Sequence, residues 1–385
     1  MSTLKVTNIE HGSTTDGGIQ LDSSGHVTVD GQQLPTSGAF SGRNLIINGA
    51  QEVDQRDSGS SAIGTLTGGK YITDRWKVRG EGNTTGQGSQ SGNVPDGFVN
   101  SLLVEVGATA NARSADTNRF IRQNVEGYVL RRLRWGTSAA KAATISFWIK
   151  SSLTGTYSFS FFSGSLDQHY VTNYTINTAD TWEFKTISVP GPTSGTFRTD
   201  NGLALFIQWD LGTGTNYQTS TLDQWASGDK RCSNNAVDFF NTANATLRIT
   251  GIQFEMGEKA TPFEYRSYGD ELARCMRYYE TGVCFGMYKT SDDTFGWTQY
   301  SVQKRTNPTV ELNPPGSNPS TNQAYYHSTD SSDRGNRAIN EINPSGQMPN
   351  QTNFKNGFIA TMGGFTPAST NDAMWTSNYI AEAEL

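Results

Sequence analysis

Aromatic residues set among amide and carboxylate side chains are the part of this sequence best suited to a chemical task. In the last quarter of the chain, Trp297, Tyr325, Tyr326 and Trp375 each lie near Asn, Asp or Gln. The face of such a ring packs against the C–H groups of a sugar, and the polar neighbours hydrogen-bond its hydroxyls. We therefore predict these four as ligand-binding residues, although each one taken singly also suits a core position.

Four other tryptophans are interpreted in the same terms. Trp209 and Trp225 also have polar neighbours and join the candidate aromatic residues. Trp76 and Trp148 stand in the middle of apolar, strand-like segments, which favours the core for both.

Motifs for other kinds of chemistry are weak. The four histidines are far apart, without metal-ligand spacing, and no Ser or Cys has a recognisable nucleophile context. The segment GTLTGGKY (64–71) matches a phosphate-binding loop only in part, because Tyr71 replaces the Ser or Thr that binds magnesium. We expect no catalytic residue, no metal site and no cofactor.

Carboxylates leave one alternative open, because glycan hydrolysis needs only two of them. Glu52, Asp54 and Asp57 gather near one predicted loop, and Asp330 and Asp333 near another. Carboxylates in such a pattern more often lie in solvated loops than in catalytic sites. A calcium site built from these loops also stays open.

Composition narrows the class of protein. Only 34% of the 385 residues are hydrophobic, yet 41 glycines and 42 aromatic residues (19 Phe, 15 Tyr, 8 Trp) argue for many short strands rather than disorder. A net charge of −6 provides no basic field for nucleic acid. No apolar run approaches the roughly 18 residues of a membrane helix, and the N-terminus lacks a signal-peptide pattern. We expect a protein made in the cytoplasm, without membrane insertion, whose three cysteines stay free thiols.

The segment 245–279 marks the boundary between the two main parts of the chain. Leu247 and Ile249 alternate with polar residues, and after Gly251 the apolar phase slips by one to Ile252 and Phe254. A glycine at a phase slip indicates a β-bulge. The period then becomes helical, with Leu272, Met276 and Tyr279 predicted on one side, and Ser267 and Asp270 form a weak capping pattern.

The region before this boundary, 41–266, is predicted to be an antiparallel jelly-roll β-sandwich. Its candidate strands alternate apolar and polar residues and are rich in β-branched and aromatic types. We expect Phe147, Ile149, Leu205 and Ile207 in the core. The predicted strands are 44–49, 71–78, 98–106, 144–150, 156–162, 181–189, 203–211 and 246–256, with a loop at 80–93.

The two ends of the chain are also predicted to be β-structure, so the fold class is all-β. After a helical linker (267–282), a small C-terminal β-domain (283–385) begins with a hairpin around 291–293 and ends in a strand that must be paired. In the N-terminal segment (1–40), a hairpin at 19–29 has an apolar side that it cannot cover alone.

Short motifs along the chain resemble one known family. The sequence GIQFEMG (251–257), followed by ATPFEYRSYGDEL and RCMRYYE, resembles the end of the jelly-roll domain in many tail-fibre proteins of tailed bacteriophages. The resemblance recurs, in the usual order, at NLIINGAQEVDQR (44–56), YITDRW (71–76), ISFWIKSS (145–152) and YIAEAEL (379–385).

This resemblance implies a component of the virion tail that binds host-surface glycan or lipopolysaccharide without catalysis. It also implies that residues 1–40 attach the protein to other phage tail proteins and, with the uncovered hairpin, hold a homotrimer. Residues 283–385 would then form a distal knob that meets the receptor, although the jelly roll remains an alternative location. Two other functions stay open: a purely structural adaptor or collar fibre, and a polysaccharide depolymerase.

Overall fold

A computed structural model of the protein describes most of the chain. The described residues are 8–9, 19–21, 27–29, 32–33, 42–56, 69–82, 85–290, 293–313, 323–327, 335–338, 341–343, 356–363 and 374–385. The chain divides into two compact units, Met1–Arg266 and Ser267–Leu385. The division falls where the sequence predicts the jelly roll to end. Where the structure describes helices, none is long and apolar enough to cross a membrane.

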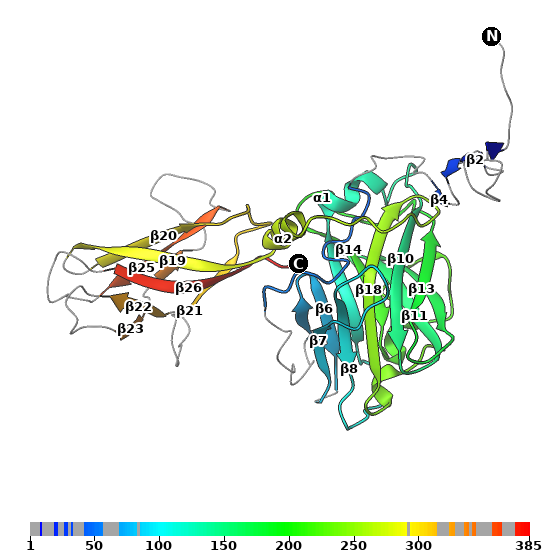
Figure 1. Ribbon diagram of the computed structural model, residues 1–385. Helices are drawn as coiled ribbons and strands as arrows, with labels where there is room; N and C mark the ends of the chain where they lie inside the picture. Colours follow the sequence, from blue (N-terminus) through cyan, green and yellow to red (C-terminus); the bar gives the residue numbers. More distant parts are fainter. Residues whose placement is uncertain are drawn as a thin grey trace, which may run out of the picture. The chain divides into compact units, whose positions relative to one another are not determined.

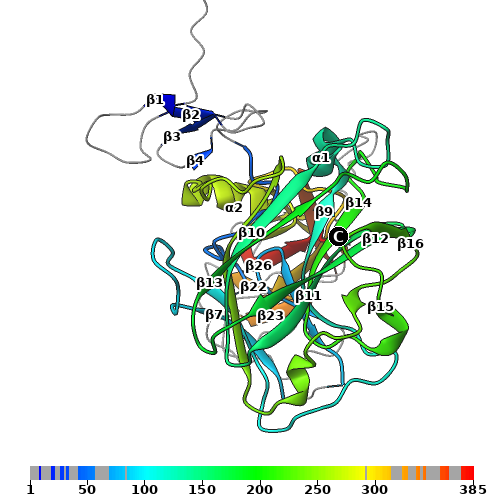
Figure 2. The ribbon, with the colours of Figure 1, turned by 90° about the vertical axis from the view of Figure 1, so that its right-hand side faces the viewer.

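The first unit contains the predicted antiparallel jelly roll, with two sheets in its described residues (Figures 1 and 2). One sheet has five strands in the order β13 (Glu183–Val189), β10 (Ala143–Ser151), β18 (Thr246–Met256), β8 (Ser101–Glu105) and β7 (Gln87–Ser91). The other has seven, in the order β16 (Trp225–Ser227), β12 (Gln168–Ile176), β11 (Gly155–Ser163), β14 (Leu203–Asp210), β9 (Arg119–Glu126), β6 (Trp76–Gly80) and β5 (Lys70–Thr73).

Short elements connect these strands. They are α1 (Gly127–Leu130), the 3₁₀ turns Arg131–Leu133, Thr215–Tyr217 and Phe239–Asn241, and the parallel pair β15 (Gln218–Thr219) and β17 (Cys232–Ser233).

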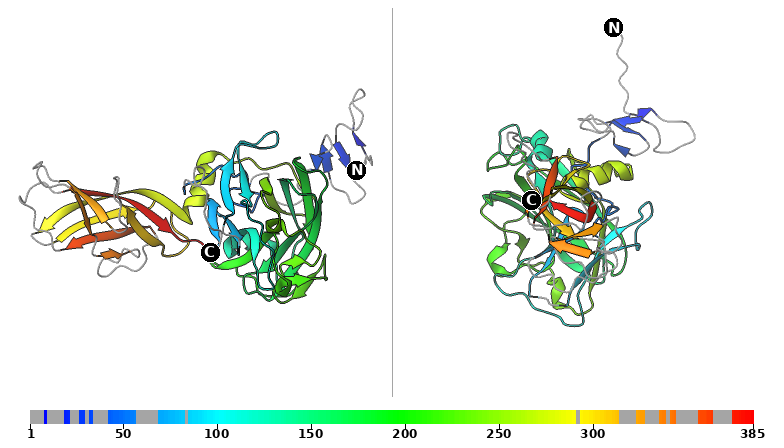
Figure 3. Two further views of the ribbon diagram at one scale, coloured as in Figure 1. Left: turned by 90° about the horizontal axis from the view of Figure 1, so that it is seen from below. Right: turned by 90° about the vertical axis from the view of Figure 1, so that its left-hand side faces the viewer.

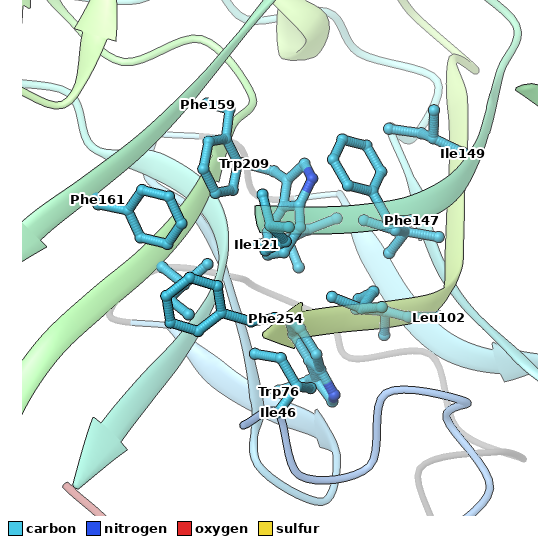
Figure 4. Packing of buried hydrophobic residues seen from close by; sticks show 14 of the residues in the cluster. Ile46, Trp76, Leu102, Ile121, Phe147, Ile149, Phe159, Phe161, Trp209 and Phe254 are labelled. Carbon is cyan, nitrogen blue, oxygen red and sulfur yellow. The ribbon is translucent and has the colours of Figure 1, made fainter. Parts of the chain in front are cut away.

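The core lies between the two sheets because alternate residues of each strand point inward. Phe147 of β10 and Phe159 of β11 both pack edge-on against Trp209 of β14, with ring centroids 5.3 and 5.0 Å away (Figure 4). The prediction that Phe147, Ile149, Leu205 and Ile207 are core residues is confirmed, since all four are fully buried.

The predicted bulge in β18 is confirmed. Opposite β10 the register shifts between the pairs Ser146–Gln253 and Trp148–Thr250, so β18 carries one extra residue there. Gly251 adopts a left-handed φ of +61°, which glycine reaches without a steric penalty. The shift keeps Ile249 and Ile252 on the buried side of the strand.

The prediction of a strand at 44–49 is wrong. Side-chain hydrogen bonds interrupt the backbone ladder there: the side-chain oxygen Oδ1 of Asn44 accepts hydrogen bonds from the N–H groups of Ile46 and Phe254, at 2.9 and 3.0 Å. Gln123 likewise exchanges two hydrogen bonds with the backbone of Ile47, at 2.8 and 3.0 Å. The segment is therefore buried but irregular.

Other strand boundaries also differ from the prediction. Residues 71–78 form the hairpin of β5 and β6 with a turn at Asp74 and Arg75, rather than one strand. The predicted loop 80–93 contains β7, and the sequence did not indicate β9 or β12.

The predicted N-terminal hairpin at 19–29 is present in a small antiparallel sheet. Ile19 pairs with Val29 and Leu21 with Val27. The described strands of this sheet are β1 (Asn8–Ile9), β2 (Ile19–Leu21), β3 (Val27–Val29) and β4 (Gln32–Gln33).

The second unit opens with helix α2 (Tyr268–Met276). Ser267 caps it by accepting a hydrogen bond from the Asp270 N–H at 3.2 Å, as the capping pattern predicts. Its buried residues are Glu271 and Cys275, while Leu272 and Met276 of the predicted apolar side are half-buried. The helix ends before Tyr279, which already begins the next strand.

One antiparallel sheet makes up most of the described residues that follow (Figure 3). Its strands are β23 (Gly335–Ala338), β22 (Gln323–His327), β26 (Met374–Glu382), β19 (Tyr279–Thr290), β20 (Asp293–Gln299), β25 (Gly357–Gly363) and β24 (Glu341–Asn343) in order, with β21 (Thr309–Asn313) paired to β26. The predicted hairpin of β19 and β20 is confirmed, and so is the pairing of the final strand.

Candidate functional site

An aromatic pair lies on the outer surface of the five-stranded sheet. Trp148 belongs to the outward row of β10, because Phe147 and Ile149 on either side of it point into the core. It lies directly opposite Phe184 of β13, and the two ring centroids are 5.3 Å apart. Phe184 is 48% exposed and Trp148 is half-buried. The expectation that Trp148 is a core residue is therefore wrong.

Gly251 allows a further ring to approach this pair. A β-carbon on Gly251 would lie 2.6 Å from Cζ of Phe98 and 3.1 Å from Cδ1 of Trp148. Both rings thus occupy the space that a side chain at the bulge would fill. The glycine connects the Trp148–Phe184 pair to a second group of aromatic residues.

That second group consists of Phe98, Phe263 and Tyr265. Their ring centroids are 5.0 to 5.7 Å apart, within the range of favourable aromatic contacts. The Tyr265 hydroxyl donates to the Gly97 carbonyl at 3.1 Å, and 60% of the residue is exposed. We call the surface made by Trp148, Phe184, Phe98, Phe263 and Tyr265 the aromatic face.

Polar groups converge beside the aromatic face at Asn93. Its side-chain oxygen lies 3.3 Å from Trp182 Nε1 and 3.4 Å from Lys150 Nζ. Lys150 follows Trp148 by two residues and therefore points to the same side of β10. Asn93 is exposed, which leaves its amide N–H₂ open to solvent.

The carboxylate nearest the pair in sequence, Glu183, is already engaged. It accepts hydrogen bonds from Lys185 and from the backbone N–H groups of Asn177 and Thr178. Desolvation is the largest single effect and opposes ionisation, but these bonds together lower the pKa of Glu183 to about 2. Glu183 is thus an ionised carboxylate that fixes the loop before β13.

The aromatic face has the chemistry of a surface that binds sugars. Flat rings offer area to the C–H side of a pyranose, and amide, indole and ammonium groups at their edge can donate hydrogen bonds to hydroxyls. The Trp148–Phe184 pair is held on neighbouring strands, and the other three rings pack against one another from irregular segments, so the rings are positioned before any ligand arrives.

The four ligand-binding residues predicted from sequence lie on three strands of one sheet, β20, β22 and β26. Phe285 pairs with Trp297 on one side and with Thr376 on the other, and Thr376 pairs with Tyr325. Tyr326 pairs directly with Trp375, and β19 lies between β26 and the strand of Trp297.

Three of the exposed side chains described in that C-terminal sheet are large and apolar. Trp297 is 62% exposed, and Phe285 and Val283 of β19 are 57% and 47% exposed. Cys284 lies between them in sequence and is fully buried with Tyr300, Phe358 and Tyr379 on the other side. Trp297 is the one predicted site residue whose side chain is described, and it is on the solvent side.

The other tryptophans predicted from sequence, and the cysteines, lie in positions that support the fold. Trp209 is fully buried beside Trp76, at 5.7 Å between ring centroids, so Trp76 is a core residue as predicted. The Trp225 indole donates to the Pro190 carbonyl at 2.6 Å. The three cysteines, all in the described part of the chain, are buried, and none of them forms a disulfide.

The structure describes only some of the carboxylates that gather near one another in the sequence. Asp57, Asp330 and Asp333 lie outside the described residues. Within the ranges that are described, no three His, Cys, Asp or Glu side chains gather in a way that could hold a metal ion.

Sequence reasoning missed the aromatic face, although one signal for it was present. In the strand-like segment ISFWIKSS, side chains alternate between the two faces, so burial of Phe147 and Ile149 places Trp148 on the outer face. The outward position of Trp148 indicates a binding surface only once Phe184 of β13 is known to lie opposite it. The pairing of β10 with β13 cannot be derived from the sequence of β10 alone.

No protein-family model matches this sequence, and no curated protein matches it. Solved structures similar to it include the enzymatically active domain of tailspike protein 4 from bacteriophage CBA120, at 12% identity and a TM-score of 0.30, covering 56% of this chain and 21% of that one. The CBM22-1–GH10 modules of Clostridium thermocellum endo-1,4-β-D-xylanase 10B have 12% identity and a TM-score of 0.30, with coverage of 56% and 29%.

A third similar structure is the CBM22-1 xylan-binding domain of Paenibacillus barcinonensis Xyn10C, at 12% identity and a TM-score of 0.26, covering 58% of this chain and 100% of that one. The matches to the first two chains span less than a third of each. The neighbours are thus carbohydrate-binding modules and a phage tailspike domain at low identity. The function of this chain is therefore argued from its own aromatic face.

Proposed function

We propose that this protein is a non-catalytic, carbohydrate-binding component of a bacteriophage tail that recognises glycan on the host surface. The observation that carries the proposal is the aromatic face, in particular the outward pair Trp148 and Phe184 with Asn93, Lys150 and Trp182 at its edge. The same chain already has a complete core on the inner side of that sheet.

An outward aromatic pair of this kind needs a functional reason. Contiguous apolar surface on a soluble protein usually marks a binding site, because it gains nothing from contact with water. Trp148 and Phe184 lie on adjacent strands rather than scattered singly, and Gly251 extends their surface to Phe98. Donors and an acceptor beside rings suit a sugar better than they suit a purely apolar partner.

The place in a virion rests on the sequence motifs that resemble tail-fibre proteins. The small N-terminal sheet supports attachment, since its hairpin leaves Ile19 44% exposed. In this proposal residues 1–40 bind other tail proteins, and the protein is made in the host cytoplasm before assembly into the tail. A structural adaptor or collar fibre would need no exposed pair such as Trp148 and Phe184.

A depolymerase is the remaining alternative, and activity on polysaccharide tests it. Recombinant protein incubated with host lipopolysaccharide or capsule should release no reducing ends. Release that a single carboxylate substitution abolishes would replace the binding proposal with an enzymatic one.

Binding of full-length variants to host cells tests the site. Phe184→Ala and Trp148→Ala should each weaken binding by roughly thirtyfold, since a central aromatic residue in a recognition site contributes ~2 kcal/mol or more. Tyr128→Ala is a matched control, because Tyr128 is 49% exposed on α1 and away from the five-stranded sheet. Thermal melting of each variant separates lost binding from lost folding. Unchanged binding by Phe184→Ala at wild-type stability would contradict the proposal.

The C-terminal domain, predicted from sequence to meet the receptor, is tested with Trp297→Ala. Its directly paired neighbour Phe285 is apolar, whereas the edge of the aromatic face has Asn93 hydrogen-bonded to Lys150. We therefore expect Trp297→Ala to leave both binding and melting unchanged. A thirtyfold loss of binding with unchanged melting would instead assign the receptor to the C-terminal sheet.

A further inference from the structure

Two cations lie opposite each other beside the aromatic face. Lys150 of β10 and Arg248 of β18 are directly paired in the antiparallel ladder. By the register of the two strands, both lie on the same outer face of the sheet as Trp148. Like charges at directly opposed positions destabilise a sheet. The two positive charges of Lys150 and Arg248 therefore need a negative group nearby that offsets their repulsion.

Neither cation has a carboxylate partner among the described residues. The Lys150 ammonium has its hydrogen bond to Asn93 at 3.4 Å, and Arg248 Nη1 lies 3.4 Å from the Thr246 hydroxyl. Both contacts are long and involve neutral oxygens. The Nε atom of Arg248 is buried and makes no hydrogen bond at all. An arginine that donates so few of its five N–H groups has donors left for a ligand.

Among the described residues, no neighbouring acid forms an ion pair with Lys150 or Arg248. Glu183 forms its ion pair with Lys185 at 2.6 Å, and Glu255 binds Thr261 and Gln253. Glu105 of β8 is the next outward carboxylate along the sheet, diagonal to Arg248 by register, and it forms no ion pair within the described residues.

We infer that the glycan bound by the aromatic face is acidic, with a carboxylate or phosphate group held between Lys150 and Arg248. The inference rests on the proposed function, because it assumes that a sugar ring packs on Trp148 and Phe184. Lys150 is two residues from Trp148 on the same side of β10, so one saccharide unit reaches both the rings and the cations. The planar guanidinium of Arg248 matches a carboxylate or phosphate by paired hydrogen bonds.

Binding of the full-length protein to paired glycans tests this inference. The probes are immobilised bacterial polysaccharides in three groups: neutral, uronic-acid-bearing and phosphate-bearing. Wild-type protein should bind acidic members and lose affinity as the ionic strength rises from about 0.05 M to about 0.5 M, because salt screens the charges. The group that binds distinguishes a carboxylate from a phosphate.

Charge-removing variants complete the test. Lys150→Gln combined with Arg248→Gln should lower affinity for the acidic glycan at least about tenfold and remove most of the salt dependence. Arg198→Gln is the matched control, since it also removes a positive charge but from an exposed pair with Asp200 elsewhere. Melting curves verify that each variant is folded.

The outcomes separate this inference from the proposed function. Preference for neutral glycans, with equal affinity in the Lys150/Arg248 variant, would overturn the acidic ligand while leaving carbohydrate binding intact. Absence of binding to every glycan and to host cells would overturn both.

Discussion

The single residue with the greatest influence on the aromatic face is Gly251. Its left-handed φ creates the bulge in β18, and its missing side chain leaves the space in which Phe98 and Trp148 approach each other. Structure and proposed function therefore depend on the same position. A side chain there would have to displace a ring that is part of the binding surface.

Gly251→Ala should lower both stability and glycan affinity. The left-handed conformation costs a non-glycine residue about 1–3 kcal/mol, and the new β-carbon would push the Phe98 ring aside. Gly42→Ala is the matched control, because Gly42 has a similar φ of +71° and nothing within 4 Å of its added β-carbon. Both variants should melt at lower temperature. Equal affinities in the two would show that Gly251 does not shape the binding surface.

Asp210, at the end of β14, should give the jelly roll a distinctive pH dependence. Complete burial raises the pKa of this carboxyl to about 6, against hydrogen bonds from Gly212 and Thr213 that lower it. The folded state thus holds a proton that the unfolded state has lost. This contribution to stability is fully present below pH 3.8, the unfolded pKa, and is lost as pH rises through about 6.

Asp210→Asn should remove that dependence. The stability of the wild-type protein relative to the variant should fall by up to about 3 kcal/mol between about pH 4 and about pH 7. Chemical denaturation of both proteins at the two pH values measures this difference. A constant difference would mean that the carboxyl titrates at an ordinary pKa in the folded protein.

At the level of elements, the second unit is held together by a buried ion pair. Lys304 and Glu280 are both almost completely buried, and Tyr379 donates a hydrogen bond to Glu280 at 2.8 Å. Burial lowers the pKa of Lys304, whereas hydrogen bonds from Lys304 and from the Ser301 N–H lower that of Glu280 in spite of burial. The pair fastens the irregular segment after β20 to strands β19 and β26.

Lys304→Met should destabilise this unit by about 3–5 kcal/mol, because it leaves Glu280 buried without a counter-charge. Hydrogen exchange of peptides from β19 and β26 should accelerate, with no change in jelly-roll peptides. Arg198→Met removes an exposed ion pair that solvent screens, so it should leave stability and exchange almost unchanged. Unchanged exchange in β19 would argue against a structural role for the pair.

The elements that sequence reasoning found are those whose side chains alternate cleanly. β10, β14 and β18 were predicted within a few residues, and the bulge at Gly251 was placed correctly. β9 was missed because its sequence RFIRQNVE is largely polar although nearly all of it is buried. Its Gln123 side chain, for example, hydrogen-bonds the backbone of Ile47, which is 76 residues away in the sequence. The burial of a polar residue by such a distant partner cannot be predicted from the local sequence.

The candidate site was harder to predict than the fold. Aromatic residues near polar ones are found in both cores and binding sites, so polar neighbours alone do not distinguish Trp209, which is buried, from Trp148, which is half-exposed. The aromatic face also needs Phe184, Gly251 and Phe98 to meet from separate strands and a loop. Composition near a single tryptophan cannot supply that information.

At the level of the whole molecule, we expect a homotrimer that depends on residues 1–40. The hairpin β2–β3 is too small to be stable alone, and Ile19 is 44% exposed. Closed threefold symmetry would bury three copies of this apolar side against one another. Light scattering on the full chain and on a truncated chain that begins at Ser41 measures the mass of each. A full-length monomer would contradict the prediction.

The central claim is that the outer surface of the five-stranded sheet binds glycan. Calorimetric titration of purified host-surface polysaccharide into wild-type protein and into the Trp148→Ala/Phe184→Ala double variant tests it most directly. We expect saturable binding by the wild type and at least a hundredfold weaker binding, at ~1.4 kcal/mol per tenfold, by a variant that remains folded. Equal affinity of the two proteins would contradict it.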